Sequence, residues 1–427
     1  RLSIEPDVDN SCFKLQVNAT GDSEATADIR LSDPDGNTVA SLQGVATGTP
    51  CTLPVNAPEL WSPEHPYLYD LNITLSSEGQ QTDAVKSYCG MRKIEVKNVD
   101  GTPRIFLNDT QIFQMGPLDQ GWWPDGLYTA PSDEALLFDI KAMKELGFNM
   151  IRKHIKVEPS RWYMHCDREG ILVWQDLPSP NLPAGHEAFA RQNFEEEAVR
   201  IIDAFENHPS IVQWVVFNEG WGQFDTERMT QVVIDKVSPQ SLVCCASGWN
   251  DAEIGDIKDS HSYPYPSCPI DQKRACVNGE YGGITLKVPG HIWPGGDFGY
   301  TAVETPEDFT VMFNDLADKI KDHYYYGLNA AVYTQLSDVE IEKNGIYTYD
   351  RRILKPYSPT GELKDKILEC INMPQSDVKI QPVVSTAKEH KYKWKFITED
   401  NAPRHWFSKG FDDSLWPKGT AAFGKSS

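Results

Sequence analysis

The chain is 427 residues long, and its 40% hydrophobic and 24% charged residues are typical of a globular protein. Lys and Arg total 40 against 62 Asp and Glu, which gives a formal net charge of −22. That charge repels nucleic acid and anionic membrane surfaces, and no segment approaches the roughly eighteen apolar residues of a membrane helix. We therefore expect neither partner, and the length predicts several domains.

The cysteines give no sign of a disulfide framework or a zinc site. The nine residues are scattered, odd in number and without any Cys-x-x-Cys pair, whereas such sites depend on close or regular spacing. We expect mostly buried free thiols. Because the chain begins at Arg1 and its last segment stops short of a complete module, we also expect it to be a piece of a longer protein.

Residues 1–97 predict a small β-sandwich. Apolar and polar residues alternate in the segments 13–19, 25–31 and 69–75, and turn-forming sequences lie at 33–36 and 63–66. A period of two is typical of antiparallel strands with one face in solvent. Two packed sheets of such strands form a sandwich.

Residues 98–373 show a different pattern, in which short apolar runs alternate with helical stretches. The runs are 112–115, 148–152, 171–175, 211–218, 242–247, 257–261, 275–280 and 330–336. Helical patterns cover 133–146, 160–169, 187–207, 226–237 and 306–326, and the helices after the fifth and sixth runs must be short. Eight strands that alternate with helices predict a closed (β/α)8 TIM barrel.

The ends of the first two helices are marked by residues typical of helix boundaries. Ser132 is a suitable N-cap and Gly147 follows the last apolar residue of the first helix. Pro159 opens the second helix and Gly170 closes it. These signals support the helix assignment.

The segment 374–427 predicts the start of another β-rich module after a linker. Tyr392, Trp394 and Phe396 alternate as in a strand, but the chain ends before a sandwich can close. We expect this module to be incomplete.

The functional prediction depends on two glutamates at the carboxyl ends of predicted barrel strands. Glu219 follows the fourth run and Glu280 ends the seventh. Side chains at the carboxyl ends of barrel strands share one face, and strands four and seven face each other across the barrel. Two opposed carboxylates suit glycoside hydrolysis, with retention of configuration when they lie about 5–5.5 Å apart and inversion at about 6.5–9.5 Å.

Several ordered motifs between residues 55 and 356 resemble those of glycoside hydrolase family 2. They are Ala57-Pro-Glu-Leu-Trp61-Ser-Pro-Glu-His-Pro-Tyr67-Leu-Tyr69, Asn149-Met-Ile-Arg152, Cys166-Asp-Arg-Glu-Gly170, His208-Pro-Ser-Ile-Val, Asn218-Glu219 and Glu280-Tyr281-Gly282. The resemblance implies an immunoglobulin-like sandwich before the TIM barrel, with a jelly-roll domain ahead of both in complete enzymes. It also implies retaining exo-hydrolysis, with Glu219 as acid/base and Glu280 as nucleophile.

The sugar is less clearly indicated, because the family includes β-galactosidases, β-glucuronidases and β-mannosidases. Lys153-His154-Ile-Lys-Val replaces the familiar Ser-His-Tyr-Pro, and Pro117-Leu-Asp119-Gln-Gly replaces the His-Glu after the first strand. Trp174-Gln-Asp176 is similar to the mannosidase pattern, but Phe-Asn-Glu-Gly around Glu219 is not. The asparagine and lysine signature of glucuronidases is not evident. We predict a β-galactosidase, with the other two activities as alternatives.

Neighbours of the two glutamates receive roles on physical grounds. Asn218 is placed to bind the sugar 2-hydroxyl. Tyr281 is predicted to hydrogen-bond Glu280, and Arg152 to lower the pKa of that glutamate by its charge. The ring of Trp221 is predicted to provide the apolar surroundings that keep Glu219 protonated.

Further residues at strand ends are predicted to contact substrate. His261 and Tyr263, at the end of the sixth strand, would orient the nucleophile or a sugar hydroxyl. Aromatic rings in these loops can stack on a pyranose; they belong to Trp122, Trp123, Trp221, Trp249 and Trp293. Asp119, Asn250 and Gln335 are predicted to recognise sugar hydroxyls. Lys343 and Asn344 are expected to be solvated loop residues.

Two other classes of protein stay open. A metal-dependent hydrolase would use His154 and His261, although no His-x-His or His-Glu-x-x-His spacing supports it. A catalytically silent barrel would only bind carbohydrate. We expect a carbohydrate partner, no metal or other cofactor, and a possible homo-oligomer. The family's role in scavenging glycans suggests a periplasmic or secreted location.

Overall fold

The computed structural model describes residues 1–21, 25–179, 187–237 and 239–375, together with the short segments 393–395, 412 and 414–420. The chain divides into two compact units, residues 1–376 and 377–427. In the second unit, β21 (Lys393–Lys395) pairs antiparallel with β22 (Lys418–Thr420). Trp394 lies in β21, as predicted, whereas Tyr392 and Phe396 lie outside the described residues.

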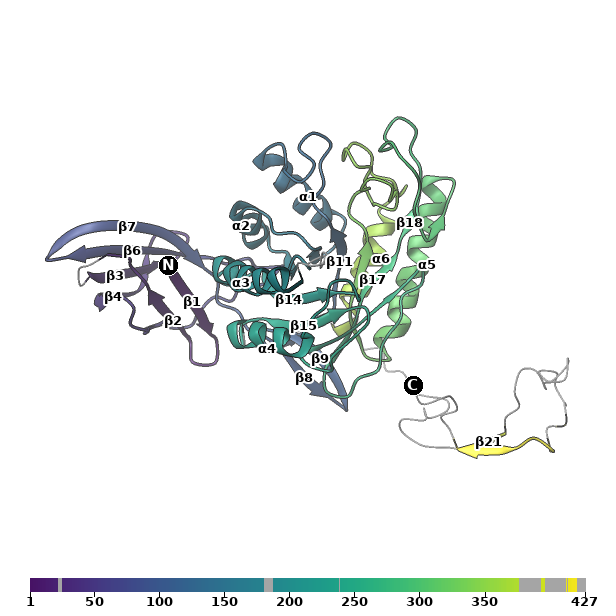
Figure 1. Ribbon diagram of the computed structural model, residues 1–427, viewed down its shortest axis with the longest axis horizontal. Coiled ribbons are helices and arrows are strands. Elements are labelled where there is room, and N and C mark those ends of the chain that lie inside the picture. Colours follow the sequence, from purple (N-terminus) through teal and green to yellow (C-terminus); the bar gives the residue numbers. More distant parts are fainter. Residues whose placement is uncertain are drawn as a thin grey trace. The chain divides into compact units, whose positions relative to one another are not determined.

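The first unit begins with an immunoglobulin-like sandwich of two antiparallel sheets (Figure 1). One sheet has the order β1 (Leu2–Asp7), β2 (Cys12–Val17), β5 (Cys51–Pro54), and the other β4 (Thr38–Ala46), β3 (Ala25–Ser32), β6 (Tyr69–Ser77), β7 (Gln80–Cys89). Alternate residues of β3 point inward, so Ala27, Ile29 and Leu31 are buried among apolar side chains of the facing sheet such as Phe13. The alternation in the sequence is thus the pattern of a sheet buried on one face.

A small antiparallel sheet covers the amino-terminal end of the barrel, and the sequence pattern did not predict it. It consists of β8 (Ile94–Val99), β9 (Thr102–Leu107) and β10 (Thr110–Gln111). Ile94, Ile105 and Leu107 pack against buried residues of the barrel interior. Arg104 Nη1 donates to the carbonyl of Leu328, at the start of a barrel strand, at 2.9 Å. The carboxyl ends of the strands are thereby left for a functional site.

The barrel contains eight parallel strands, and each overlaps one predicted run. They are β11 (Gln114–Asp119), β12 (Met150–Lys153), β13 (Leu172–Asp176), β14 (Ile211–Asn218), β15 (Leu242–Ser247), β16 (Ile257–Ser262), β17 (Ala275–Gly282) and β20 (Leu328–Thr334). Hydrogen bonds connect them in the order β15, β14, β13, β12, β11, β20, β17, β16, and contacts between β15 and β16 complete the ring. The first strand runs on to Asp119 rather than ending at Met115.

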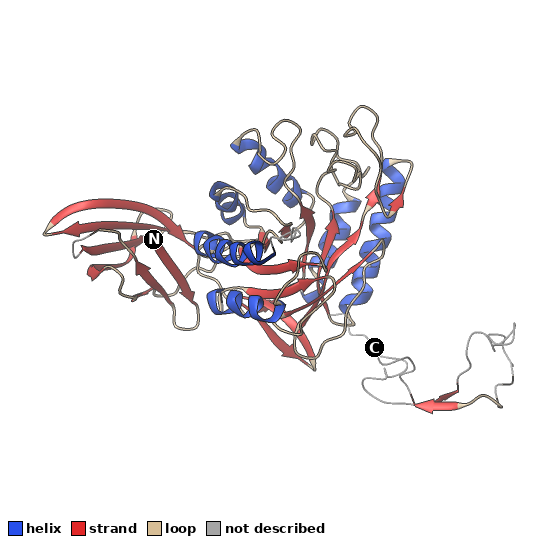
Figure 2. Ribbon diagram, viewed as in Figure 1, coloured by secondary structure: helices blue, strands red, loops and turns tan. Residues whose placement is uncertain are grey.

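Helices surround the strands (Figure 2). They are α1 (Asp133–Glu145), α2 (Ser160–Glu169), α3 (Glu187–Phe205), α4 (Thr226–Val237), α5 (Pro306–Tyr324) and α6 (Glu362–Ile371), of which α6 was not predicted. Ser132 Oγ accepts the amide hydrogen of Ala135 at 3.2 Å, and Gly170 closes α2 with a left-handed φ of 70°. None of the helices in the described residues combines the length and apolar character needed to cross a membrane.

Two barrel connections carry residues predicted for the site. Residues 248–256 after β15 and 263–274 after β16 are all described, and neither connection contains a helix, so the prediction of short helices there is wrong. The short β18 (Ile284–Thr285) and β19 (Thr301–Ala302) pair within the long connection between β17 and α5.

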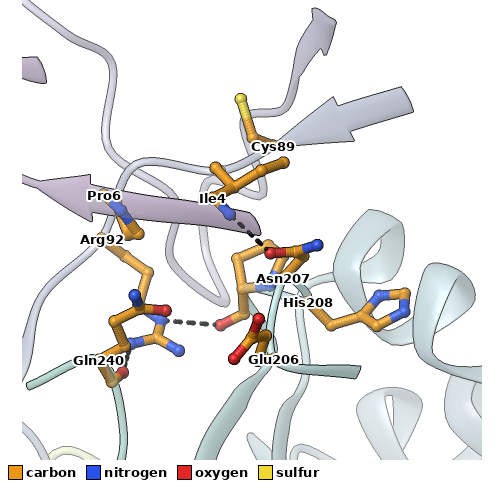
Figure 3. A pocket seen from close by; sticks show the side chains of 10 residues that line it. Ile4, Pro6, Cys89, Arg92, Glu206, Asn207, His208 and Gln240 are labelled. Carbon is orange, nitrogen blue, oxygen red and sulfur yellow. Dashed lines mark hydrogen bonds between the residues drawn. The ribbon is translucent and has the colours of Figure 1, made fainter. Parts of the chain in front are cut away.

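The sandwich and the barrel meet at a small pocket around Arg92 (Figure 3). The guanidinium of Arg92 is buried and donates to the carbonyls of Pro209 at 3.0 Å and Ile211 at 2.6 Å, and also to that of Gln240. The amide of Ile4 donates to Asn207 Oδ1 at 2.9 Å across the same junction. Hydrogen bonds therefore tie the sandwich to the starts of β14 and β15.

Candidate active site

The two predicted catalytic glutamates come together at the carboxyl ends of β14 and β17. One oxygen of Glu219, one oxygen of Glu280 and a ring nitrogen of His261 all lie within 4.8 Å of one another. Glu280 is 7% exposed, and the side chain of Glu219 is 18% exposed. Two carboxylates this close can act on the same bond of a substrate.

The surroundings of Glu280 favour its ionised form. Burial alone would raise the pKa of Glu280, but positive charge at His261, His154 and Arg152 lowers it below its usual range. Tyr263 adds to this effect by donating its hydroxyl hydrogen to Oε2 at 2.6 Å. Glu280 is therefore suited to act as a nucleophile.

Arg152 connects the two sides of the site. It is fully buried at the end of β12, and its Nε and Nη2 donate to the two oxygens of Asp176 at 3.1 and 3.0 Å. Nη2 also donates to Asn218 Oδ1 at 2.8 Å, and Nη1 lies 3.5 Å from Glu280 Oε1. The same guanidinium thus fixes the orientation of Asn218 and stabilises the charge of Glu280.

Glu219 lies in a tight turn with a left-handed backbone, φ 54°. This conformation is uncommon for residues other than glycine and often marks functional sites. Trp221 Nε1 donates to Glu219 Oε2 at 2.8 Å, and its ring is 69% exposed. The expectation of an apolar cover from Trp221 is therefore corrected, because the ring is largely in solvent and acts on Glu219 as a hydrogen-bond donor.

His261 lies between the glutamates and is held from behind by a hydrogen-bond chain. Its Nε2 is 2.8 Å from Ser247 Oγ, and that hydroxyl donates to Asp259 Oδ2 at 2.5 Å. Gly248 has φ +98°, and a Cβ there would lie 2.9 Å from His261 Nδ1, so the ring requires glycine beside it. Sequence reasoning missed Ser247 and Asp259, although both lie on predicted barrel strands.

Tyr263 rather than Tyr281 is the phenol that reaches Glu280. Tyr281 is fully buried outside the ring of strands, where it packs edge-on against Tyr333 at 5.8 Å. Successive strand residues point to opposite faces, so a Glu280 that points into the barrel directs Tyr281 outward. The prediction for Tyr281 is wrong for this reason. Tyr263 also stacks on Tyr300, with ring centres 3.5 Å apart.

Asp119 is buried in an ion-pair cluster instead of facing a sugar. Its Oδ2 lies 2.5 Å from Lys153 Nζ, and its Oδ1 accepts from the amide of Gly121 at 2.8 Å. Lys153 also pairs with Glu158 at 3.0 Å. Because Asp119 is only 2% exposed and both its oxygens are hydrogen-bonded, the structure contradicts the predicted role in hydroxyl recognition.

Gln335 supports a carboxyl group that sequence reasoning missed. It is 1% exposed, and its Nε2 donates to Glu342 Oε2 at 2.7 Å and to Asn344 Oδ1 at 2.8 Å. Burial and the negative charge of Glu280 raise the pKa of Glu342. The expectation that Lys343 and Asn344 are solvated is wrong, because both are buried.

Two of the predicted substrate-binding residues lie beside the Glu219 turn. Trp249 is 47% exposed and approaches His261 edge-on at 5.8 Å. A Cβ added at Gly220 would lie 2.7 Å from Asn250 Nδ2 and 3.2 Å from Trp249 Nε1. Exposed polar and aromatic groups therefore border the Glu219 side of the site.

Trp293 belongs to a separate group of rings. It packs edge-on against Tyr349 at 5.4 Å and lines a small pocket with Trp122 and Trp123. The lining of this pocket includes neither catalytic glutamate. The predicted aromatic residues therefore form two groups, of which the one at Trp221 and Trp249 adjoins Glu219.

A TIM barrel that presents paired glutamates from its fourth and seventh strands has the architecture of a glycoside hydrolase, and comparison with known families agrees. The model described as Glycosyl hydrolases family 2 matches residues 1–92, and that described as Glycosyl hydrolases family 2, TIM barrel domain, matches residues 130–368. These matches cover most of the chain, which therefore belongs to glycoside hydrolase family 2.

Individual relatives carry two different activity names. The chain is 29% identical over 230 residues to a β-galactosidase of Lactococcus lactis subsp. lactis, a match that covers 52% of this chain and 22% of that protein. It is 26% identical over 234 residues to a β-glucuronidase of Bacteroides fragilis, covering 51% and 32%. The chain thus spans less than a third of the length of either relative.

A solved structure shows the same fold. The β-glucuronidase of Ruminococcus gnavus superposes with a TM-score of 0.67 at 18% identity, covering 86% of this chain and 68% of that one. At this identity the likeness establishes the architecture of sandwich and barrel.

Proposed function

We propose that the protein is a retaining exo-β-glycosidase, with Glu280 as nucleophile and Glu219 as acid/base, and that its substrate is a β-galactoside. The observation that carries this proposal is the approach of the two carboxylates to within 4.8 Å. Retaining glycosidases have carboxyl groups about 5–5.5 Å apart, whereas inverting enzymes leave a larger gap for water.

The two glutamates have different surroundings, as the two roles require. Arg152 and Tyr263 contact Glu280 and favour its charge, whereas Glu219 accepts a hydrogen bond from Trp221 and shares another with His261. In the first step, Glu280 attacks the anomeric carbon while the leaving oxygen takes a proton from Glu219. In the second step, water gives a proton to Glu219 and displaces Glu280.

Asn218 is oriented to bind the sugar. Its Oδ1 accepts from Arg152, so its amide Nδ2 is directed elsewhere as a donor. This orientation supports the proposed contact with the sugar 2-hydroxyl, which strengthens as charge develops at the anomeric carbon.

The charge around the site favours a neutral sugar over a uronic acid. A uronate needs an available cation for its carboxylate. Lysines at or beyond the carboxyl ends of barrel strands are paired with acidic residues: Lys153 with Asp119 at 2.5 Å, Lys156 with Glu158 at 2.9 Å and Lys343 with Asp297 at 3.0 Å. The carboxyl group of Glu342 also has a pKa raised by burial and by the negative charge of Glu280, so it adds no cation to the site. These pairings support a β-galactoside rather than a β-glucuronide.

The test is a panel of aryl β-galactoside, glucuronide, mannoside, glucoside and α-L-arabinoside substrates. We expect the β-galactoside to be hydrolysed fastest and its first product to be the β-anomer by NMR. Glu280→Gln should reduce turnover to less than about a thousandth while sugar binding persists. Undiminished turnover in Glu280→Gln would refute the assignment, and a first product with the α-configuration would refute retention.

Further parts of the proposal need their own tests. Dialysis against a chelator should leave activity unchanged; loss that zinc restores would favour the metal-dependent alternative. Sugar binding without turnover in the unaltered chain would favour the silent barrel. Periplasmic or secreted location and assembly as a homo-oligomer are proposals that cell fractionation and light scattering can test.

A further inference from the structure

One ring nitrogen of His261 faces both catalytic carboxylates. Nδ1 lies 2.9 Å from Glu219 Oε1 and 3.4 Å from Glu280 Oε2, and the side chain is 1% exposed. A neutral imidazole carries a hydrogen on only one of its two nitrogens. Whether Nδ1 carries a hydrogen therefore decides whether each carboxylate faces a hydrogen-bond donor or a lone pair.

The neighbours of the other ring nitrogen, Nε2, determine that it carries a hydrogen. The single hydrogen of Ser247 goes to Asp259 Oδ2, so Ser247 Oγ can only accept from His261 Nε2 at 2.8 Å. Asp259 is fixed in turn, because its Oδ1 accepts from the amide of Gly279 at 2.6 Å. Nε2 thus carries a hydrogen, and Nδ1 is where the ring gains or loses a proton.

One carboxylate oxygen of Glu219, Oε2, is likewise fixed as a hydrogen-bond acceptor. The indole of Trp221 can only donate, so Oε2 accepts from it at 2.8 Å. The contact between Oε1 and Nδ1 then needs one hydrogen, which either atom can hold. A single exchangeable proton lies on the line between Glu219 and His261.

We propose that His261 is a positioning residue that shares the catalytic proton with Glu219 and couples its release to the charge of Glu280. This inference rests on the proposed double displacement. In the first step, an oxygen of Glu280 bonds to the anomeric carbon and the bond to the leaving oxygen breaks. The electron pair stays on the leaving oxygen, which takes the shared proton from Glu219.

The second step returns the proton to the contact between Glu219 and His261. Once the proton has left, the lone pair of Nδ1 faces the carboxylate of Glu219, and their repulsion makes the pair a stronger base. Water attacks the anomeric carbon, the ester bond breaks with its electrons returning to Glu280, and the proton from water returns to the line between Glu219 and His261.

The charges around His261 connect the charge of Glu280 directly to the acidity of the shared proton. Glu219, Glu280 and Asp259 raise the pKa of the imidazole, whereas burial and the charge of Arg152 lower it. As Glu280 forms its bond to the sugar it loses negative charge, and the shared proton becomes more acidic. This happens at the moment when the leaving oxygen needs the proton.

The first experiment compares leaving groups in His261→Asn, which keeps an N–H donor but cannot pass on a proton. We expect kcat/KM to fall about 100-fold for a methyl β-glycoside, which needs an acid, and less than about threefold for a 2,4-dinitrophenyl glycoside. The basic limb of the pH profile should shift only for the first substrate. An equal loss on both substrates with an unchanged pH profile would overturn the proposal.

A matched control is His165→Asn. His165 pairs with Asp133 at 2.9 Å between α1 and α2, outside the barrel. This variant replaces a partly buried, carboxylate-paired histidine without touching the site. It should keep the kinetics of the unaltered protein for both substrates.

The second experiment does not depend on turnover. Nitrogen-15 NMR of labelled histidine, with the signal assigned through His261→Asn, should show that Glu219→Gln lowers the pKa of the His261 ring, because a carboxylate charge is removed. An unchanged titration would overturn the shared proton. If the chain hydrolyses none of the glycosides but the NMR shift appears, the proposed function fails while the proton-sharing pair stands.

Discussion

The hydroxyl of Tyr263 lies 2.6 Å from Oε2 of Glu280 and 2.7 Å from Oγ1 of Thr334. A phenol in this position can donate to the carboxylate while the threonine hydroxyl donates to the phenol oxygen. The hydrogen bond favours the ionised form of Glu280, which is the form that the proposed double displacement requires.

Tyr263→Phe should therefore weaken catalysis chiefly at low pH. Loss of the donor raises the pKa of Glu280, so the acidic limb of the kcat/KM profile moves to higher pH and kcat falls about tenfold at neutral pH. Tyr265→Phe, which alters a half-exposed ring two residues along, is the control. A profile that coincides with that of the unaltered protein would contradict this role for Tyr263.

Trp249→Ala should impair binding of the leaving group. Its half-exposed ring borders the acid side of the site, where the second sugar of a disaccharide would lie. We expect KM for a disaccharide to rise about fivefold, since aromatic contacts contribute on the order of 1 kcal/mol. A glycosyl fluoride has no second sugar and should be unaffected, whereas equal effects on both substrates would argue against the contact.

Glu342→Lys should change the choice of sugar. A cation near the nucleophile can bind the carboxylate of a uronic acid, so the rate on an aryl β-glucuronide relative to the galactoside should rise at least about tenfold. Glu340→Lys introduces the same charge at an exposed position two residues away and serves as control. An unchanged ratio in Glu342→Lys would show that Glu342 lies outside the sugar-binding region.

Arg92→Met should destabilise the junction between sandwich and barrel. The substitution removes the Arg92 donor from the carbonyls of Pro209 and Gln240 and leaves that of Ile211 only the hydroxyl of Ser241, so the free energy of unfolding should fall by about 3 kcal/mol or more. Arg200→Met removes an exposed pairing with Glu196 on α3 and should cost less than about 0.5 kcal/mol. Urea unfolding followed by fluorescence measures both, and equal stabilities would contradict the anchoring role.

The barrel was predictable because parallel strands buried on both faces read as continuous apolar runs. The polar residues at the ends of those runs then indicated Glu219, Glu280, Arg152 and Asn218. The error at Tyr281 arose from treating a neighbour in sequence as a neighbour in space, although strand residues alternate between faces.

Other parts of the site depend on contacts between distant segments. Ser247 and Asp259 support His261 only because β15 and β16 lie side by side where the ring closes. Glu342 is held by a hydrogen bond from Gln335, seven residues earlier in the chain. The burial of Asp119 depends on Lys153 from the next strand. Sequence periodicity carries no information on such pairings.

The position of Arg92 determines which shorter versions of this protein can fold stably. The carbonyls that it binds lie at the beginnings of β14 and β15, and the far ends of these strands carry Glu219 and Ser247. A fragment trimmed to begin near residue 98 would lack this anchor, so the ends of the strands opposite the chemistry would lose their support. Deletion series and domain grafts should therefore keep the sandwich joined to its barrel.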